Sequence, residues 1–204
     1  MNKKLVFAAI AALIAIGIYW SLQPAGIDAE AYQKEIEAFR EERAEFMRSN
    51  ENSPFKNMTF EGLNYFPADP DYQVTAVIDR IEERSYMNIP TTGGENERYL
   101  KYAYAKFDLK GQRLQLLILK QVGLGATDIL FTAFADDTSG ESTYGGGRYL
   151  DLSFKNANRI TIDFNKAYNP YCEYDPKFVC PLPPKENILP IAIEAGEKRY
   201  NTGE

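Results

Sequence analysis

The 204-residue chain contains no histidine, only two cysteines and a single tryptophan. Without an imidazole, the Ser–His and Cys–His forms of nucleophilic catalysis, histidine metal sites and histidine proton shuttles are excluded. Basic residues are also in deficit, because 29 Asp and Glu outnumber 23 Lys and Arg and give a formal charge of −6. Such a chain is repelled by nucleic acid and by anionic membrane surfaces, so no nucleic-acid partner is expected.

One long apolar run stands at the N-terminus. Lys3 and Lys4 precede residues 5–22, which are apolar except for one serine and would span ~27 Å as a helix, at the short end of what crosses a bilayer. The lysines should stay in the cytoplasm, which places the rest of the chain outside, in the periplasm or at the cell surface. The alternative is a cleaved signal peptide, which is disfavoured because Gln23 and Pro24 occupy positions where cleavage prefers small residues.

Residues 28–49 have the pattern of an amphipathic helix. Asp28 stands in the N-cap position, and the apolar residues fall on one stripe with charged residues elsewhere. The stripe consists of Tyr32, Ile36, Phe39, Phe46 and Met47. Such a helix packs on its own domain or contacts a partner protein, and the narrow stripe favours the first.

The rest of the sequence has the pattern of a β-rich core. Aromatic residues make up 13% of the whole chain, which suits such a core. Lys110 and Gly111 separate two strand-like runs and indicate a hairpin. Residues 85–98, which include Pro90 and two glycines, are expected to form a surface loop. About seven strands are predicted, at residues 72–78, 99–109, 112–122, 128–135, 148–154, 159–164 and 188–195.

These elements predict a mainly β fold. We expect a single β-sandwich or partly closed barrel over residues 55–200, with the amphipathic helix before it. Together they form one soluble domain over residues 28–204, preceded by a transmembrane anchor and linker over residues 1–27.

Cys172 and Cys180 are the only pair of cysteines. In an oxidising compartment a disulfide is the default, and we predict one here. The rival interpretation is a metal pair, which needs further soft or nitrogen ligands that the chain lacks. No metal site and no cofactor are predicted.

The stretch DDTSGESTYGGGRYLDL, residues 136–152, concentrates polar side chains between two apolar strands. Consecutive glycine amides can cradle an anion, and an adjacent arginine adds a bidentate donor, so a carboxylate or phosphate would suit this corner. The alternative is that the arginine pairs with a neighbouring acid and locks a structural loop. The candidate ligand contacts are Arg148, Gly145, Gly146, Gly147, Asp136, Asp137, Glu141 and Tyr144.

A second polar run is IDFNKAYNPYC. Asp163 and Asn165 alternate with apolar residues and therefore share one face of a strand, and Tyr168 follows them. These three residues form either a polar pocket beside the first loop or a buried hydrogen-bond network that holds strand ends together. Both interpretations stay open.

Several segments taken together resemble one family. They are TSGESTYGGGRYLDL, DFNKAYNPYC, CPLPPKEN and IEAGEK, with SPF and GLNYFP in the front half. The combination resembles the domain of unknown function 1684 family over about residues 30–200. Members of that family are often secreted or membrane-attached, although this chain lacks the lipid-attachment cysteine that some of them carry. The resemblance implies a single domain and implies no activity.

Three classes of function fit these observations. The favoured one is a membrane-tethered extracytoplasmic binding module for a small anionic or sugar ligand. The second is a structural accessory of a cell-envelope complex, with the helix of residues 28–49 as its protein contact. The third is a hydrolase with Asp136 or Asp137 as base and Glu141 as acid, which ranks last because the chain lacks the commonest proton carrier.

The apolar run predicts how the expressed protein partitions. We expect the full-length chain to stay in the membrane fraction of a bacterial host after an alkaline wash, because residues 5–22 bury their apolar side chains in the bilayer. Fractionation with intact-mass analysis checks this. A soluble product whose first residue lies between 24 and 27 would instead establish the cleaved signal peptide.

Overall fold

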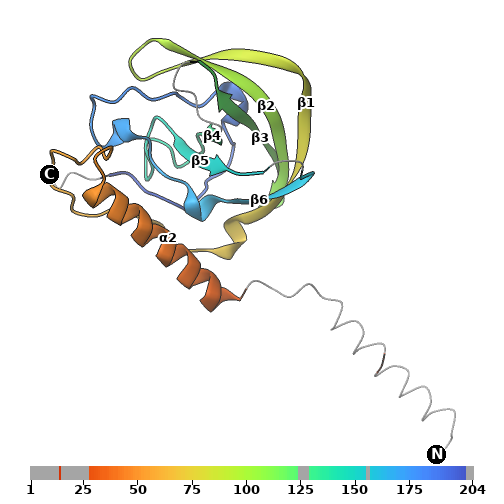
Figure 1. The fold of residues 1–204 in the computed structure, drawn as a ribbon. Helices are drawn as coiled ribbons and strands as arrows, with labels where there is room; N and C mark the ends of the chain where they lie inside the picture. The colour runs from red at the N-terminus through yellow and green to blue at the C-terminus, as the bar shows by residue number, and fades with distance from the viewer. Residues whose placement is uncertain (1–13, 15–27, 124–128, 155–156, 201–204) are drawn as a thin grey trace, which may run out of the picture.

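The computed structural model describes residues 14, 28–123, 129–154 and 157–200. In this part of the chain, six strands form one antiparallel sheet in the order β5-β4-β3-β2-β1-β6, which curls into a half-barrel (Figure 1). The strands are β1 (Gln73–Pro90), β2 (Asn96–Leu109), β3 (Gln112–Gln121), β4 (Leu130–Phe134), β5 (Arg148–Leu152) and β6 (Arg159–Asp163). The helix α2 spans Ala29–Ser49, and four short 3-10 turns cover Pro70–Tyr72, Phe164–Lys166, Tyr171–Glu173 and Lys185–Asn187.

The hairpin between β2 and β3 forms where the sequence predicts it. Lys110 and Gly111 connect the strands with φ angles of 49° and 76°. Two successive positive φ angles are what a two-residue turn needs to match the right-handed twist of its strands. Leu109 pairs with Gln112 across the turn, so the turn sets the register of the central pair of strands.

The prediction of a surface loop over residues 85–98 was wrong. β1 continues to Pro90 and β2 begins at Asn96, so only the residues between them turn. The paired strands hold together because Ile89 and Tyr99 are buried on the convex face of the sheet, in a cluster with Leu117 and Leu119. Proline is tolerated at Pro90 because it stands at the end of its strand.

The prediction of a strand over residues 188–195 was also wrong. The segment is irregular and touches the sheet through one parallel bridge between Ala135 and Ile188. Its apolar side chains nevertheless point into the half-barrel, where Ile191, Ile193 and Ala195 belong to the main core. The apolar pattern therefore reflects burial rather than strand pairing.

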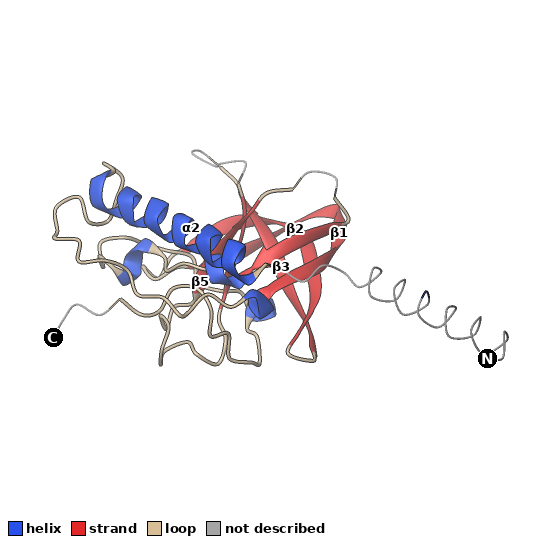
Figure 2. Ribbon diagram, turned by 90° about the horizontal axis from the view of Figure 1, so that it is seen from below, coloured by secondary structure: helices blue, strands red, loops and turns tan. Residues whose placement is uncertain are grey.

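The helix α2 lies alongside the loops at one end of the sheet (Figure 2). Asp28 caps it, and its carboxylate accepts from the backbone N–H groups of residues 30 and 31. Tyr32, Ile36 and Met47 are buried and Phe39 and Phe46 are half-buried, so most of the apolar stripe is covered by the protein's own domain. Among the described residues, no helix has the length and apolar character to cross a membrane. The expected anchor at 5–22, apart from Ile14, lies outside those residues.

Candidate functional site

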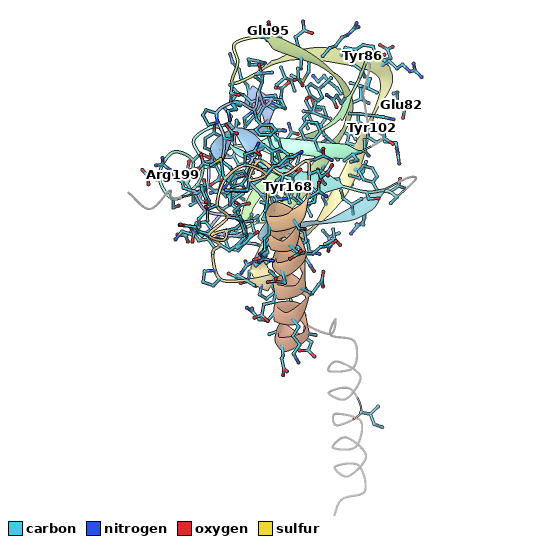
Figure 3. The ribbon with its side chains drawn as sticks, turned by 60° about the vertical axis from the view of Figure 1, so that its left-hand side comes forward. Glu82, Tyr86, Glu95, Tyr102, Tyr168 and Arg199 are labelled. Carbon is cyan, nitrogen blue, oxygen red and sulfur yellow. The ribbon has the colours of Figure 1, made fainter. Side chains whose placement is uncertain are left out.

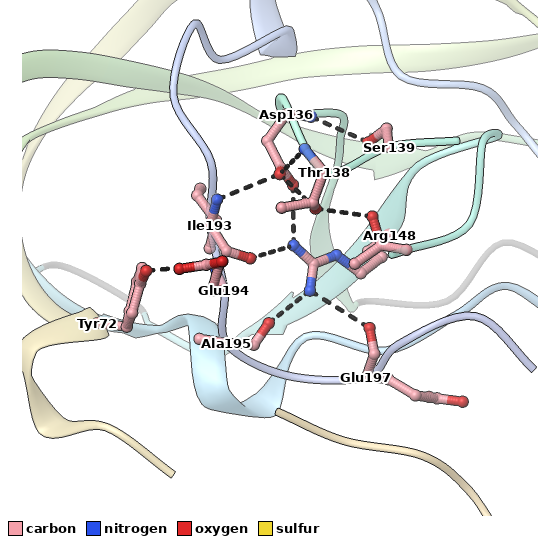
Figure 4. A network of polar contacts seen from close by, with 10 residues as sticks. Tyr72, Asp136, Thr138, Ser139, Arg148, Ile193, Glu194, Ala195 and Glu197 are labelled. Atoms are coloured by element: carbon pink, nitrogen blue, oxygen red, sulfur yellow. Dashed lines mark hydrogen bonds and ion pairs between the residues drawn. The ribbon is translucent and has the colours of Figure 1, made fainter. Parts of the chain in front are cut away.

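The arginine of the glycine-rich stretch forms a buried ion pair. Arg148 and Asp136 both have fully buried side chains, and 2.8 Å separates Nη2 from Oδ2. The guanidinium also donates to the backbone carbonyls of Ile193 at 2.9 Å, Ala195, and Glu197 at 3.3 Å (Figure 4). Arg148 therefore holds the C-terminal segment against the end of β5.

Both carboxylate oxygens of Asp136 also accept hydrogen bonds. Oδ1 of Asp136 accepts from the backbone and hydroxyl of Thr138, at 2.9 and 2.6 Å, and from the backbone N–H of Ile193 at 3.2 Å. Desolvation lowers the pKa of Arg148, and the charge of Asp136 opposes that shift. This geometry corresponds to the loop-locking alternative, because both charged groups are enclosed by protein and directed at one another.

Close packing accounts for two of the three glycines. A Cβ atom at Gly146 would lie 2.4 Å from the ring of Tyr144, and one at Gly147 would lie 2.4 Å from Pro183 and 2.6 Å from the carbonyl oxygen of Phe134. Gly147 also has a φ of +84°, which disfavours any residue with a side chain. Glycine is thus required here for the turn itself.

The other candidates in this stretch are dispersed. Asp137, Glu141 and Gly145 are exposed. Of the two candidate catalytic bases, Asp136 is enclosed in its ion pair and Asp137 is open to solvent. The hydroxyl of Tyr144 lies 3.6 Å from Sγ of Cys172.

The second polar run forms a buried network that holds α2. Tyr32 donates to Oδ1 of Asp163 at 2.9 Å, and the amide of Asn165 donates to the Tyr32 hydroxyl at 2.7 Å and to the carbonyl of Asp69 at 2.8 Å. Desolvation and the neighbouring Asp163 raise the pKa of Tyr32 far above its ordinary value of 10.0. The contacts of Asp163 and Asn165 thus correspond to the network interpretation.

A third buried group lies between α2 and the C-terminal segment. The side chain of Glu197 accepts from Tyr174 Oη and from the backbone N–H and side-chain amide of Asn169, both at 3.1 Å. Arg43 of α2 lies 3.6 Å from the same carboxylate. Burial raises the pKa of Glu197 above its ordinary value of 4.5, while Arg43 works in the opposite direction.

An open groove lies next to this network and was not predicted from the sequence. Its volume is about 380 Å³. Side chains from α2, β5 and the loop that follows Tyr168 line it, among them Arg43, Phe46, Tyr149, Asp151, Tyr168 and Tyr171. One local signal was available, because Tyr149 and Asp151 alternate along β5 and so share a face.

Tyr168 lines this groove and lies next to α2 (Figure 3). Its hydroxyl donates to Oδ1 of Asp151 at 2.9 Å, and the guanidinium of Arg43 lies 4.1 Å above its ring. The ring of Tyr149 meets it edge to face at 5.9 Å. Desolvation raises the pKa of both tyrosines far above 10, so both keep their phenolic protons at neutral pH.

The two cysteines border the loop that forms one side of the groove. Both have free thiols in this structure, and the backbone N–H of Cys172 donates to Sγ of Cys180 at 3.3 Å. The hydrogen bond from Cys180 lowers the pKa of Cys172 to about 6. The disulfide stays a prediction. Among the described residues, no three Cys, Asp or Glu side chains gather as metal ligands.

Comparison with known proteins identifies a family and a similar solved structure. The model of a family described as a protein of unknown function, DUF1684, matches residues 58–198. The solution NMR structure of an uncharacterised protein of Haloarcula marismortui is 36% identical, with a TM-score of 0.65, and the alignment covers 84% of this chain and 96% of that one. Among curated proteins, none matches the chain.

Removing the buried arginine should strongly destabilise the fold. We expect Arg148→Ala to lower the free energy of unfolding by about 3–5 kcal/mol, because Asp136 would be left as an unpaired buried charge. Urea denaturation measures this. Arg113→Ala is the control, since Arg113 is 86% exposed in its own ion pair and should change the midpoint little. Equal midpoints for Arg148→Ala and the wild type would contradict the locking role.

The buried glutamate predicts a pH dependence. Because the pKa of Glu197 is raised on folding, the folded state binds this proton more tightly than the unfolded state does. The contribution of Glu197 is therefore most favourable below pH 4.5 and declines as pH rises through the raised pKa. As pH rises from 4 to 8, the free energy of unfolding of the wild type, measured in urea, should fall relative to that of Glu197→Gln. The control Glu141→Gln, at an exposed position, should follow the wild type at every pH. A difference that stays constant with pH would refute this.

Proposed function

The chain belongs to the DUF1684 family of proteins of unknown function, and from that premise we propose that it is an extracytoplasmic binding module. Its ligand is a small neutral sugar, held in the groove around Tyr168. Residues 5–22 tether it to the membrane as an uncleaved anchor.

The observation that carries this proposal is the combination of aromatic rings with one open carboxylate. Tyr149, Tyr168 and Tyr171 line the groove together with Asp151, which is exposed. The face of an aromatic ring carries negative potential, which attracts the C–H groups on the flat side of a pyranose. Asp151 offers acceptor oxygens to sugar hydroxyls, and only one of them receives the Tyr168 hydroxyl. Small-ligand sites have this mainly apolar lining with a few placed polar groups.

The charges around the groove favour a neutral ligand over an anion. Asp151 repels a carboxylate or phosphate, and the nearest groove cation, Arg43, is already close to the carboxylate of Glu197. The arginine expected to bind an anion, Arg148, is enclosed by protein, and both of its terminal nitrogens, Nη1 and Nη2, are engaged by Asp136 and three carbonyls. A neutral ligand with hydroxyl groups is not repelled by Asp151 and does not need a free arginine.

The two other classes of function have less support. A structural accessory would use the apolar stripe of α2 as its contact, yet Tyr32, Ile36 and Met47 of that stripe are buried against the domain itself. The proposed hydrolase would use Asp136 or Asp137 as base; Asp136 is paired with Arg148 away from solvent, which leaves the exposed Asp137 as its base.

A titration tests the binding proposal. The full-length chain, in a detergent without a sugar headgroup, is titrated by calorimetry with glucose, galactose, N-acetylglucosamine, cellobiose and glucuronate. We expect saturable binding of a neutral sugar and a loss of about tenfold or more in affinity for Asp151→Ala, since a hydrogen bond to a charged acceptor contributes about 1.5–3 kcal/mol.

The matched control is Asp108→Ala. Asp108 is 70% exposed and does not line the groove. It lies near the β2–β3 turn, nine residues along β2 from Tyr99, which lines a depression beside the groove, so this variant should bind like the wild type. Preferential binding of glucuronate over glucose would favour the anionic ligand. Absence of saturable binding by every neutral sugar would overturn the proposal.

A further inference from the structure

The groove is the middle one of three adjoining depressions. A depression of about 590 Å³ lies on one side of it and includes Asn52, Asn57 and Lys177. On the other side, a depression of about 350 Å³ includes Tyr99 and Gln121. Together with the groove of about 380 Å³, they form a row along one side of the molecule, because each neighbouring pair shares residues of its lining.

Each boundary in this row includes a pair of aromatic rings, and Asp151 and Val179 also lie at one of the two boundaries. Tyr171 and Phe178 line both the large depression and the groove, and their rings meet edge to face at 5.3 Å. Tyr149 and Tyr168 line both the groove and the third depression, and they meet edge to face at 5.9 Å. Aromatic surface therefore recurs along the row at each point where one depression passes into the next.

The charges of the row are nearly balanced. Three cations line it (Arg43, Lys56 and Lys177), and so do four carboxylates (Glu51, Asp175, Asp151 and Glu97). Neutral hydrogen-bonding side chains stand at both ends, with Asn52 and Asn57 at one and Gln121 at the other. A row without a dominant sign of charge, with amides at its ends, suits a chain of neutral, hydroxylated units.

We propose that the three depressions form one trough that binds a linear neutral oligosaccharide of at least three sugar units. This rests on the sugar-binding function proposed above and extends it from a single sugar to a chain. One unit lies in each depression, and the aromatic pairs between them pack against the sugar rings. Each further unit adds contacts without repeating the translational and rotational cost of association, so affinity rises with chain length.

A saccharide fits this trough better than an extended peptide does. Peptides bind at sheet edges by pairing with unpaired backbone groups, and β5 is the edge strand on this side. That edge is already occupied beside the trough, because the backbones of Tyr149 and Tyr168 exchange hydrogen bonds of 2.8 and 3.0 Å. Side-chain rings and amides are what remains to recognise a ligand.

The experiment is a chain-length series. Cello- and chito-oligosaccharides of one to six units are titrated into the full-length protein by calorimetry, in the same sugar-free detergent. We expect the affinity for one of the two series to rise by about tenfold or more between two and five units. Asn57→Ala and Gln121→Ala, at opposite ends of the trough, should reduce that gain and leave binding of the single sugar unchanged.

Exposed Asn88 on β1, which lines none of the three depressions, provides the control variant Asn88→Ala. One outcome would separate the two proposals: equal affinity for saccharides of one, two and five units, with Asp151→Ala still weakening the binding of each. It would overturn the proposal of an oligosaccharide trough and support the single-sugar site. Failure of every saccharide to bind would overturn both proposals. Saturable binding of peptides from a tryptic casein digest, with no saccharide bound, would assign the trough to polypeptide and overturn the oligosaccharide.

Discussion

The buried pair of Arg148 and Asp136 is the interaction on which the remaining architecture depends. Within the described part of the chain, the half-barrel has no partner sheet across its concave face, and the irregular segment that carries Ile191, Ile193 and Ala195 fills this space. Arg148 holds that segment by donating to its carbonyl groups. Removing two charges from water costs several kcal/mol, which is offset only where the remaining donors and acceptors are also satisfied. The pair therefore links sheet and C-terminal segment in one arrangement, since a shifted segment would leave those groups unpaired.

The same constraint extends to the groove. The carbonyl of Glu197 accepts from Arg148, whereas its carboxylate lies near Arg43 and accepts from Tyr174 and Asn169. Arg43 in turn covers the ring of Tyr168, which lines the groove. A continuous set of polar contacts thus runs from the core to the ligand-binding surface that we propose. Tyr168 is thus held from two sides, by Arg43 of α2 above its ring and by the hydrogen bonds that its backbone exchanges with Tyr149 of β5.

Regular local patterns were the part of the fold that could be predicted from the sequence. The Lys110–Gly111 turn, the N-cap at Asp28 and the mainly β core follow from short-range rules, and the structure contains all three. Residues 85–98 were predicted wrongly because Pro90 signals a loop locally, whereas its strand is held by distant partners such as Leu117 and Leu119. Residues 188–195 were predicted wrongly because an apolar run looks the same whether it pairs as a strand or fills a core. In both cases the deciding contacts join residues that are far apart in the chain.

The candidate site shows the same limit more sharply. The stretch with the greatest density of polar residues, 136–152, serves mainly to build a turn: Arg148 and Asp136 neutralise each other, and Gly146 and Gly147 stand where a Cβ would collide. The groove instead draws Arg43 from the helix, Tyr149 and Asp151 from an edge strand, and Tyr168 from a loop. Tyr149 and Asp151 belong to the polar stretch 136–152 and share a face through their i, i+2 spacing, and Tyr168 belongs to the second polar run. No local pattern places Arg43 beside them. The groove residues span more than 100 positions of the sequence. They come together only in the folded chain, where the C-terminal segment holds Arg43 through Glu197 and is itself held by Arg148.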